Sequence, residues 1–279
     1  MVLIVFDSKD NQKSSLYYLL AKLFMLFFCR IVKKLYFCTE ILTQNSLILS
    51  FMWLIDSSIG RKVVMSVTGL ALILFLTFHA CMNVVALFSA EGYNMICEFL
   101  GANWYAVVAT LGLAALMALH FVFAIILTIQ NKKARGTDAY AVTDRPEKVE
   151  WYSQNMFVLG CIICLGICLH LWHFWYNMMW AELSNPVAAL VSVPSPSDGY
   201  AWIVWTFHDQ PGAPVYSLVY LFWFCAIWFH MNHGFWSAIQ TLGWSGKIWH
   251  NRWQCIGFIW STIVILMFAV VVIKFAVWG

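Results

Sequence analysis

The chain has 279 residues, of which 62% are hydrophobic and only 10% are charged, and its formal net charge is +3. Soluble domains typically carry about 25% charged residues, so this composition excludes an ordinary soluble domain and predicts an integral membrane protein. The small positive charge is not clustered into a basic patch, and we therefore expect membrane lipid and no nucleic acid among its partners.

Residues 1–51 differ from the rest of the chain. Their apolar run Leu23–Cys29 is too short to span a bilayer, which takes about 20 helical residues, and basic residues lie on both sides of it. The segment fits a basic helix on the cytoplasmic membrane surface, a targeting-like leader, or a stretch upstream of a natural start at Met52. We favour the last interpretation, which makes residues 52–279 the membrane domain.

Five long charge-free runs follow this N-terminal extension. A helix crosses the hydrocarbon layer with about 20 residues, so each run holds one crossing and none is long enough for two. We therefore predict an all-α bundle of five transmembrane helices. The runs are Val63–Ala90, Phe99–Asn131, Trp151–Ala181, Gln210–Gly246 and Trp253–Ile273.

Lysine and arginine are unevenly distributed among the connections between these runs. Nine lie on one side of the membrane and Lys274 alone on the other. Because connections rich in lysine and arginine stay in the cytoplasm, we expect the N-terminal end of the first helix to be cytoplasmic and the C-terminus to be outside. The nine are Arg61, Lys62, Lys132, Lys133, Arg135, Arg145, Lys148, Lys247 and Arg252.

Four histidines, His79, His120, His170 and His233, lie in four different runs. An imidazole is costly in lipid, so such residues usually face the bundle interior and have a task there. At about 1.5 Å per residue, His79 and His170 fall in the outer half of the membrane, and His120 and His233 in the inner half. Two bis-histidine pairs are the axial ligand set of two b-type haems. We therefore predict that four of the five helices enclose two haems.

The third run contains a second candidate, His173, three residues after His170. A short repeat of the form Met-x-Val-x-Gly-x9-His favours His170. The repeat begins at Met65 and ends at His79, and it begins again at Met156 and ends at His170. His170 therefore takes the place that His79 has in the first run.

The fourth run contains His230 as well as His233. The neighbouring Gly234 would let a flat macrocycle approach the backbone closely, and for this reason we prefer His233 as the ligand. His230 remains the alternative.

Several of these stretches resemble the di-haem cytochrome b membrane subunit of succinate dehydrogenase and fumarate reductase. The resemblance covers residues 52–279. It implies a subunit in the bacterial cytoplasmic (inner) membrane that binds no dicarboxylate itself, but anchors a flavoprotein subunit and an iron–sulfur subunit on the cytoplasmic face. It also implies a quinone as substrate, usually menaquinone. The segments that carry the resemblance are Ser58–Gly69 with His79, Glu98–Asn103, His170–Trp175 and His233–Ala238.

The resemblance also implies roles for individual residues. The outer histidine pair would bind the iron of a distal haem, and the inner pair that of a haem proximal to the iron–sulfur subunit. Ser66 matches a family serine near a haem propionate. In some relatives a glutamate in or near the loop after the first helix serves quinol oxidation, which makes Glu91 and Glu98 the candidate proton acceptors here.

These features together predict electron transfer from menaquinol through the distal and then the proximal haem to the iron–sulfur subunit, or the reverse. One alternative is the di-haem b subunit of another respiratory oxidoreductase. The other is a haem-free transporter or anchor whose histidines pack helices together. Transporters commonly have inverted repeats and helices broken by proline or glycine, whereas the repeat found here runs in parallel.

Overall fold

The computed structural model describes residues 56–135, 150–184 and 194–279. The extension predicted over residues 1–51 lies outside these ranges. The compact unit that contains the described helices runs from Ser58 to Gly279. All regular structure within the described ranges is helical, as the predicted all-α class requires. Its elements are α3 (Ser58–Val84), the 3-10 helix η1 (Val85–Leu87), α4 (Ala90–Phe99), α5 (Trp104–Arg135), α6 (Trp151–Gln154), α7 (Met156–His170), the π-helix η2 (Leu171–Trp180), α8 (Ala181–Ser184), α9 (Gly199–Val204), the π-helix η4 (Trp205–Asp209), α10 (Ala213–Thr241) and α11 (Lys247–Trp278).

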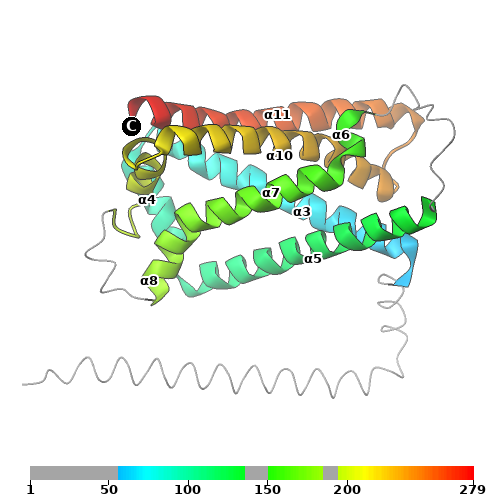
Figure 1. The fold of residues 1–279 in the computed structure, drawn as a ribbon, viewed down its shortest axis with the longest axis horizontal. Coiled ribbons are helices and arrows are strands. Elements are labelled where there is room, and N and C mark those ends of the chain that lie inside the picture. The colour runs from blue at the N-terminus through cyan, green and yellow to red at the C-terminus, as the bar shows by residue number, and fades with distance from the viewer. Residues whose placement is uncertain (1–55, 136–149, 185–193) are drawn as a thin grey trace, which may run out of the picture. The chain divides into compact units, whose positions relative to one another are not determined.

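Five helical spans are long and apolar enough to cross a membrane, as the charge-free runs predict (Figure 1). The first is α3 with η1, the second is α5, and the fourth and fifth are α10 and α11. The third span is composite, because α7 passes into η2 directly after His170 and η2 passes into α8. π-Helical turns inside a helix are rare and often occur at functional sites. Apolar periodicity does not reveal them.

The helix α10 lies at the centre of the packing. It contributes more buried residues than any other helix of the described ranges, and it packs against α3, α7 and α11. The helix α5 is at the opposite extreme, because Ala106 and Phe123 are the buried apolar residues of its described part. In Figure 1, α10 and α11 lie side by side, whereas α5 lies at the other edge of the bundle.

One end of the bundle, here called the cap end, carries α4, α8 and α9 (Figure 1). The short helices α4 and α9 meet there through Asn94 of α4. Its side chain donates to Oδ1 of Asp198 at 2.8 Å and accepts from the backbone N–H of Tyr200 at 2.8 Å. Asp198 also caps α9, since its side chain accepts from the backbone N–H of Ala201 at 3.0 Å. The charge-free runs predict neither α4 nor α9.

The opposite end of the bundle is here called the basic end. It includes the start of α3, the end of α5 and the turn between α10 and α11, where Gly243 has a positive φ of 82°. Such a backbone conformation favours glycine. The described basic side chains at this end are Arg61, Lys62, Lys132, Lys133, Lys247 and Arg252, whereas Arg145 and Lys148 lie outside the described residues.

Candidate functional site

His79 of α3 and His170 of α7 face each other toward the cap end, and they are here called the cap-end pair. Their ring centroids are 5.8 Å apart and their planes are inclined by 80°. Aromatic side chains surround them: the ring of Phe268 is 5.7 Å from that of His79, and the ring of Trp223 is 6.0 Å from that of His170. The structure thus brings together the two histidines expected to form the outer pair.

His120 of α5 and His230 of α10 form a second pair, here called the basic-end pair. Their ring centroids are 6.3 Å apart and their planes are inclined by 72°. His233, which we preferred from the sequence, instead lies next to Trp236 and Tyr152, with centroid distances of 4.9 and 6.4 Å. The structure therefore places His230 rather than His233 opposite His120.

The difference between His230 and His233 has a simple geometric cause. Residues three apart on an α-helix differ by about 4.5 Å in height and by about 60° in direction. The sequence-based preference for His233, which rested on the neighbouring Gly234, took no account of this difference. A β-carbon at Gly234 would meet nothing within 4 Å, so this glycine accommodates no close neighbour among the described residues.

The glycines of the internal repeat, by contrast, lie against the basic-end pair. A β-carbon at Gly69 would lie 3.2 Å from Cε1 of His120, and one at Gly160 would lie 3.9 Å from Cε1 of His230. Each repeat therefore places its glycine beside the basic-end pair and its histidine, ten residues later, in the cap-end pair. At the rise of an α-helix these two positions are about 15 Å apart.

Thr68 determines which nitrogen of His120 is available. Its hydroxyl donates to the carbonyl of Val64 at 2.8 Å, and its Oγ1 lies 3.0 Å from Nδ1 of His120. Because the hydroxyl proton is used within the helix, Oγ1 accepts from Nδ1–H of the imidazole. Nε2 of His120 then carries a free lone pair, the arrangement found in metal-binding histidines with a second hydrogen-bond partner. Sequence reasoning did not single out Thr68, although it directly precedes the glycine of the first repeat.

Both pairs have the spacing that two axial imidazoles require. An imidazole nitrogen binds a transition metal at about 2 Å, so the ring centroids of two imidazoles on opposite sides of one ion are roughly 6 Å apart. Nδ1 of His230 is also buried without a hydrogen-bond partner among the described residues. No group of three or more histidine, cysteine or acidic residues is placed to hold a metal in those ranges. Each pair could supply the two axial ligands of one haem iron.

Ser66, Glu91 and Glu98, also singled out from the sequence, have no ring contact or hydrogen bond to a histidine among the residues described. Ser66 is buried in α3, and its hydroxyl donates to the carbonyl of Lys62 at 2.9 Å. Glu91 and Glu98 lie in the first and last turns of α4, and both are exposed.

A hydrogen-bonded chain connects the cap-end pair to α4. The side-chain amide of Asn83 donates to the carbonyl of His79 at 2.8 Å, and the hydroxyl of Tyr93 donates to Oδ1 of Asn83 at 3.3 Å. Burial raises the pKa of Tyr93 well above its usual value, so this hydroxyl stays protonated. Burial also raises the pKa of the neighbouring Cys97 thiol to about 11. Neither Asn83 nor Tyr93 belongs to a sequence pattern that could have identified it.

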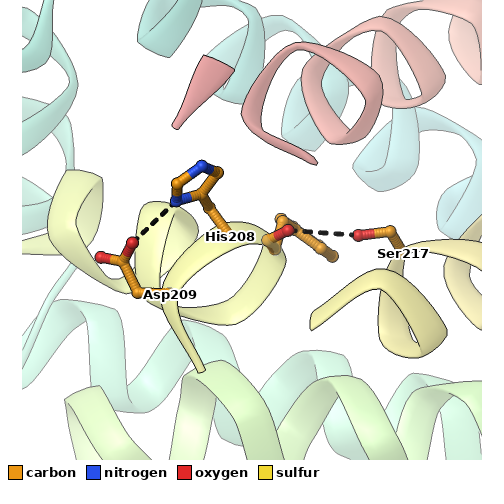
Figure 2. A network of polar contacts seen from close by, with 4 residues as sticks. His208, Asp209 and Ser217 are labelled. Carbon is orange, nitrogen blue, oxygen red and sulfur yellow. Dashed lines mark hydrogen bonds and ion pairs between the residues drawn. The ribbon is translucent and has the colours of Figure 1, made fainter. Parts of the chain in front are cut away.

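Figure 2 shows two further polar contacts of η4, at the cap end. Nδ1 of His208 lies 2.8 Å from the carboxylate of Asp209, and both side chains are exposed. The hydroxyl of Ser217, in α10, lies 3.5 Å from the carbonyl of Phe207 and donates to the carbonyl of Ala213 at 2.9 Å. His208 is thus a surface residue that belongs to neither histidine pair.

Comparisons of this chain with protein families, with curated proteins and with solved structures found no match.

Proposed function

We propose that the chain is the membrane-anchor cytochrome b subunit of a succinate:quinone oxidoreductase. In this role it passes electrons between menaquinol or menaquinone and an iron–sulfur subunit through two b haems. The observation that carries the proposal is the presence of two histidine pairs with ring centroids 5.8 and 6.3 Å apart. The choice of a succinate:quinone oxidoreductase rests on the sequence motifs described above.

The chain's own residues would supply ligands, orientation and an apolar surrounding. His79 and His170 would ligate the distal haem, and His120 and His230 the proximal one, which revises our sequence-based preference for His233. Bound haem supplies reversible one-electron transfer, at a potential set by its ligands and their surroundings. Thr68 holds the imidazole of His120 in one tautomer and orientation, as a hydrogen-bond partner does for many metal-binding histidines.

The sparse packing of α5 is compatible with a planar group beside His120. This helix carries His120, yet Ala106 and Phe123 are the buried apolar residues of its described part. Because α5 lies at the edge of the bundle, much of its surface would face lipid, and only the face that carries His120 is turned toward α3 and α10. A macrocycle between α5 and α10 would cover side chains that the protein alone leaves open.

The charge distribution supports an orientation and a docking face. The basic end would lie in the cytoplasm and bind the iron–sulfur subunit, which in turn would hold the flavoprotein subunit. The cap end would then face outward in a bacterial inner membrane. Quinol would be oxidised in that half, with the exposed carboxylate of Glu91 or Glu98 accepting a proton.

The test is a dithionite-reduced minus oxidised spectrum of the purified protein with a pyridine haemochrome count. We expect two b haems per chain. One should be lost in His79→Ala or His170→Ala, and the other in His120→Ala or His230→Ala. The surface variant His208→Ala is the matched control and should keep both. A folded, monodisperse protein without haem would exclude the electron-transfer function.

A second readout separates this function from that of another di-haem oxidoreductase subunit. We expect the chain to co-purify from its native membrane with a flavin-containing subunit and an iron–sulfur subunit. Succinate should reduce haem in that complex. Haem that formate or hydrogen reduces, and succinate does not, would instead assign the chain to another respiratory complex.

A further inference from the structure

His170 and His230 are each followed, three residues later on the same helical span, by a second histidine that lies nearer to the end of the bundle. His173 follows His170 toward the cap end, and His233 follows His230 toward the basic end. A tyrosine accompanies each second histidine: the ring of Tyr220 is 5.9 Å from that of His173, and the ring of Tyr152 is 6.4 Å from that of His233. At both ends of the bundle, a histidine that faces another histidine is thus followed by a histidine that does not.

The two second histidines differ in their hydrogen bonding. Nδ1 of His173 lies 3.3 Å from the hydroxyl of Tyr220. Nδ1 of His233 is buried and lacks any hydrogen-bond partner among the described residues. Buried imidazole nitrogens are normally paired, because an unpaired one loses its hydrogen bonds to water without replacement. The site around His233 is therefore incomplete in the protein alone.

The described side chains around His233 bring no acceptor to its Nδ1. Trp236 packs edge-to-face on the imidazole at 4.9 Å, and His250 lies beyond Trp236 at 5.2 Å. An indole ring offers a donor and no acceptor. Nδ1 is where a neutral or a protonated imidazole can carry N–H, so a carboxylate is the partner that would form the strongest hydrogen bond with it.

A haem b bound between His120 and His230 would bring such a carboxylate. Haem b carries two propionate groups, and buried carboxylates need donors. His233 lies about 4.5 Å along α10 from His230, on the side of the basic end. We propose that His233 donates a hydrogen bond from Nδ1 to a propionate of the haem held by His120 and His230. This proposal rests on the proposed function, because it requires a haem at the basic-end pair.

The experiment compares two porphyrins that differ only in their carboxylates. The full-length protein is purified without haem from a haem-deficient host, and it carries His79→Ala so that only the basic-end pair can bind. This protein is titrated with iron protoporphyrin IX and with its dimethyl ester. We expect His233→Ala to weaken binding of the free acid roughly tenfold or more and to change the affinity for the ester less than about twofold.

Two further variants complete the design. His233→Asn carries an amide nitrogen near the place of Nδ1, and we expect it to restore most of the affinity for the free acid. His173→Ala removes the corresponding histidine at the cap end, and it should leave binding of both porphyrins at the basic-end pair unchanged.

Each contrary outcome has a distinct meaning. Equal weakening for acid and ester in His233→Ala, without rescue by asparagine, would make His233 a packing residue and overturn the inference alone. Loss of all binding in His233→Ala, with binding retained in His230→Ala, would make His233 the iron ligand and also overturn it. If the chain with all its histidines binds neither porphyrin, the proposed function and this inference fail together.

Discussion

A β-carbon on Gly69 would lie 3.2 Å from Cε1 of His120, which is closer than ordinary van der Waals contact. A β-carbon on the corresponding glycine of the second repeat, Gly160, would lie farther from its imidazole, at 3.9 Å from Cε1 of His230. Both glycines therefore face the imidazoles of the basic-end pair, and only Gly69 lies too close for a β-carbon in ordinary contact. Both lie on helices that carry neither of those histidines.

Enlarging Gly69 should disturb the basic-end pair selectively. Gly69→Val should displace the ring of His120 and reduce haem content from two to about one per chain, while the cap-end haem remains. Gly160→Ala should have a smaller effect, because its methyl group would fit at ordinary contact distance. Gly112→Ala on α5 is the matched control, since a β-carbon there meets nothing within 4 Å. The pyridine haemochrome count measures all three, and an intact basic-end haem in Gly69→Val would contradict the prediction.

Replacing Thr68 should weaken the basic-end site through the orientation of His120. Thr68→Val keeps the side-chain shape but removes the acceptor for Nδ1–H, and we expect haem affinity at this site to fall on the order of tenfold. Thr68→Ser retains the hydroxyl and should stay close to the original protein. Haem titration in the His79→Ala background gives the affinities. Equal behaviour of the valine and serine variants would show that the hydroxyl is unimportant.

The His173–Tyr220 contact should contribute to stability. The two side chains are only 7% and 2% exposed, so Tyr220→Phe would leave a buried imidazole nitrogen without its partner. We expect a loss of about 1–2 kcal/mol in the free energy of unfolding. The double variant with His173→Phe should lose less than the sum of the single variants, because no unpaired polar atom remains. Unfolding in mixed detergent micelles measures the cycle, and strict additivity would argue against the hydrogen bond.

The thiol of Cys97 should react slowly at neutral pH. Its pKa of about 11, compared with 9.0 for an unperturbed thiol, leaves about 100-fold less thiolate at pH 7–8, and thiolate is the reactive form. Alkylation by iodoacetamide should therefore speed up about tenfold per pH unit up to roughly pH 11. The exposed Cys255 serves as an internal control in the same mass-spectrometric experiment.

The carboxylate of Asp198 raises the pKa of the Cys97 thiol. Asp198→Asn keeps the side-chain oxygen that caps α9 but removes the charge, and it should accelerate alkylation of Cys97. An unchanged rate would show that burial alone accounts for the raised pKa.

The number of membrane spans and the pairing of His79 with His170 could be predicted from the sequence for physical reasons. Charge-free length determines how many crossings a chain can make, and helix rise places His79 and His170 at one depth. The choice between His230 and His233 could not be predicted in this way. It depends on the rotation of α10 about its axis, which is set by packing against α3, α7 and α11. Adjacent-residue clues such as Gly234 carry no information on that rotation.

The polar residues that support the site were harder to predict for a different reason. Thr68, Asn83 and Tyr93 act through contacts with residues on other turns or other elements, and none has a distinctive spacing. The short helices α4 and α9 lie within connections whose composition resembles that of any loop. Their side-chain caps and the contact between Asn94 and Asp198 become visible only in three dimensions.

The ten-residue interval between Gly69 and His79 fixes the distance between the two histidine pairs. Both ends of the interval lie on the uninterrupted helix α3, and the matching interval from Gly160 to His170 lies on α7. The separation of the two histidine pairs is therefore set by covalent geometry within helices and not by the lengths of loops. Insertion of a single residue into either interval would turn the histidine by about 100°, so evolution could change this distance only by rebuilding one of the two sites.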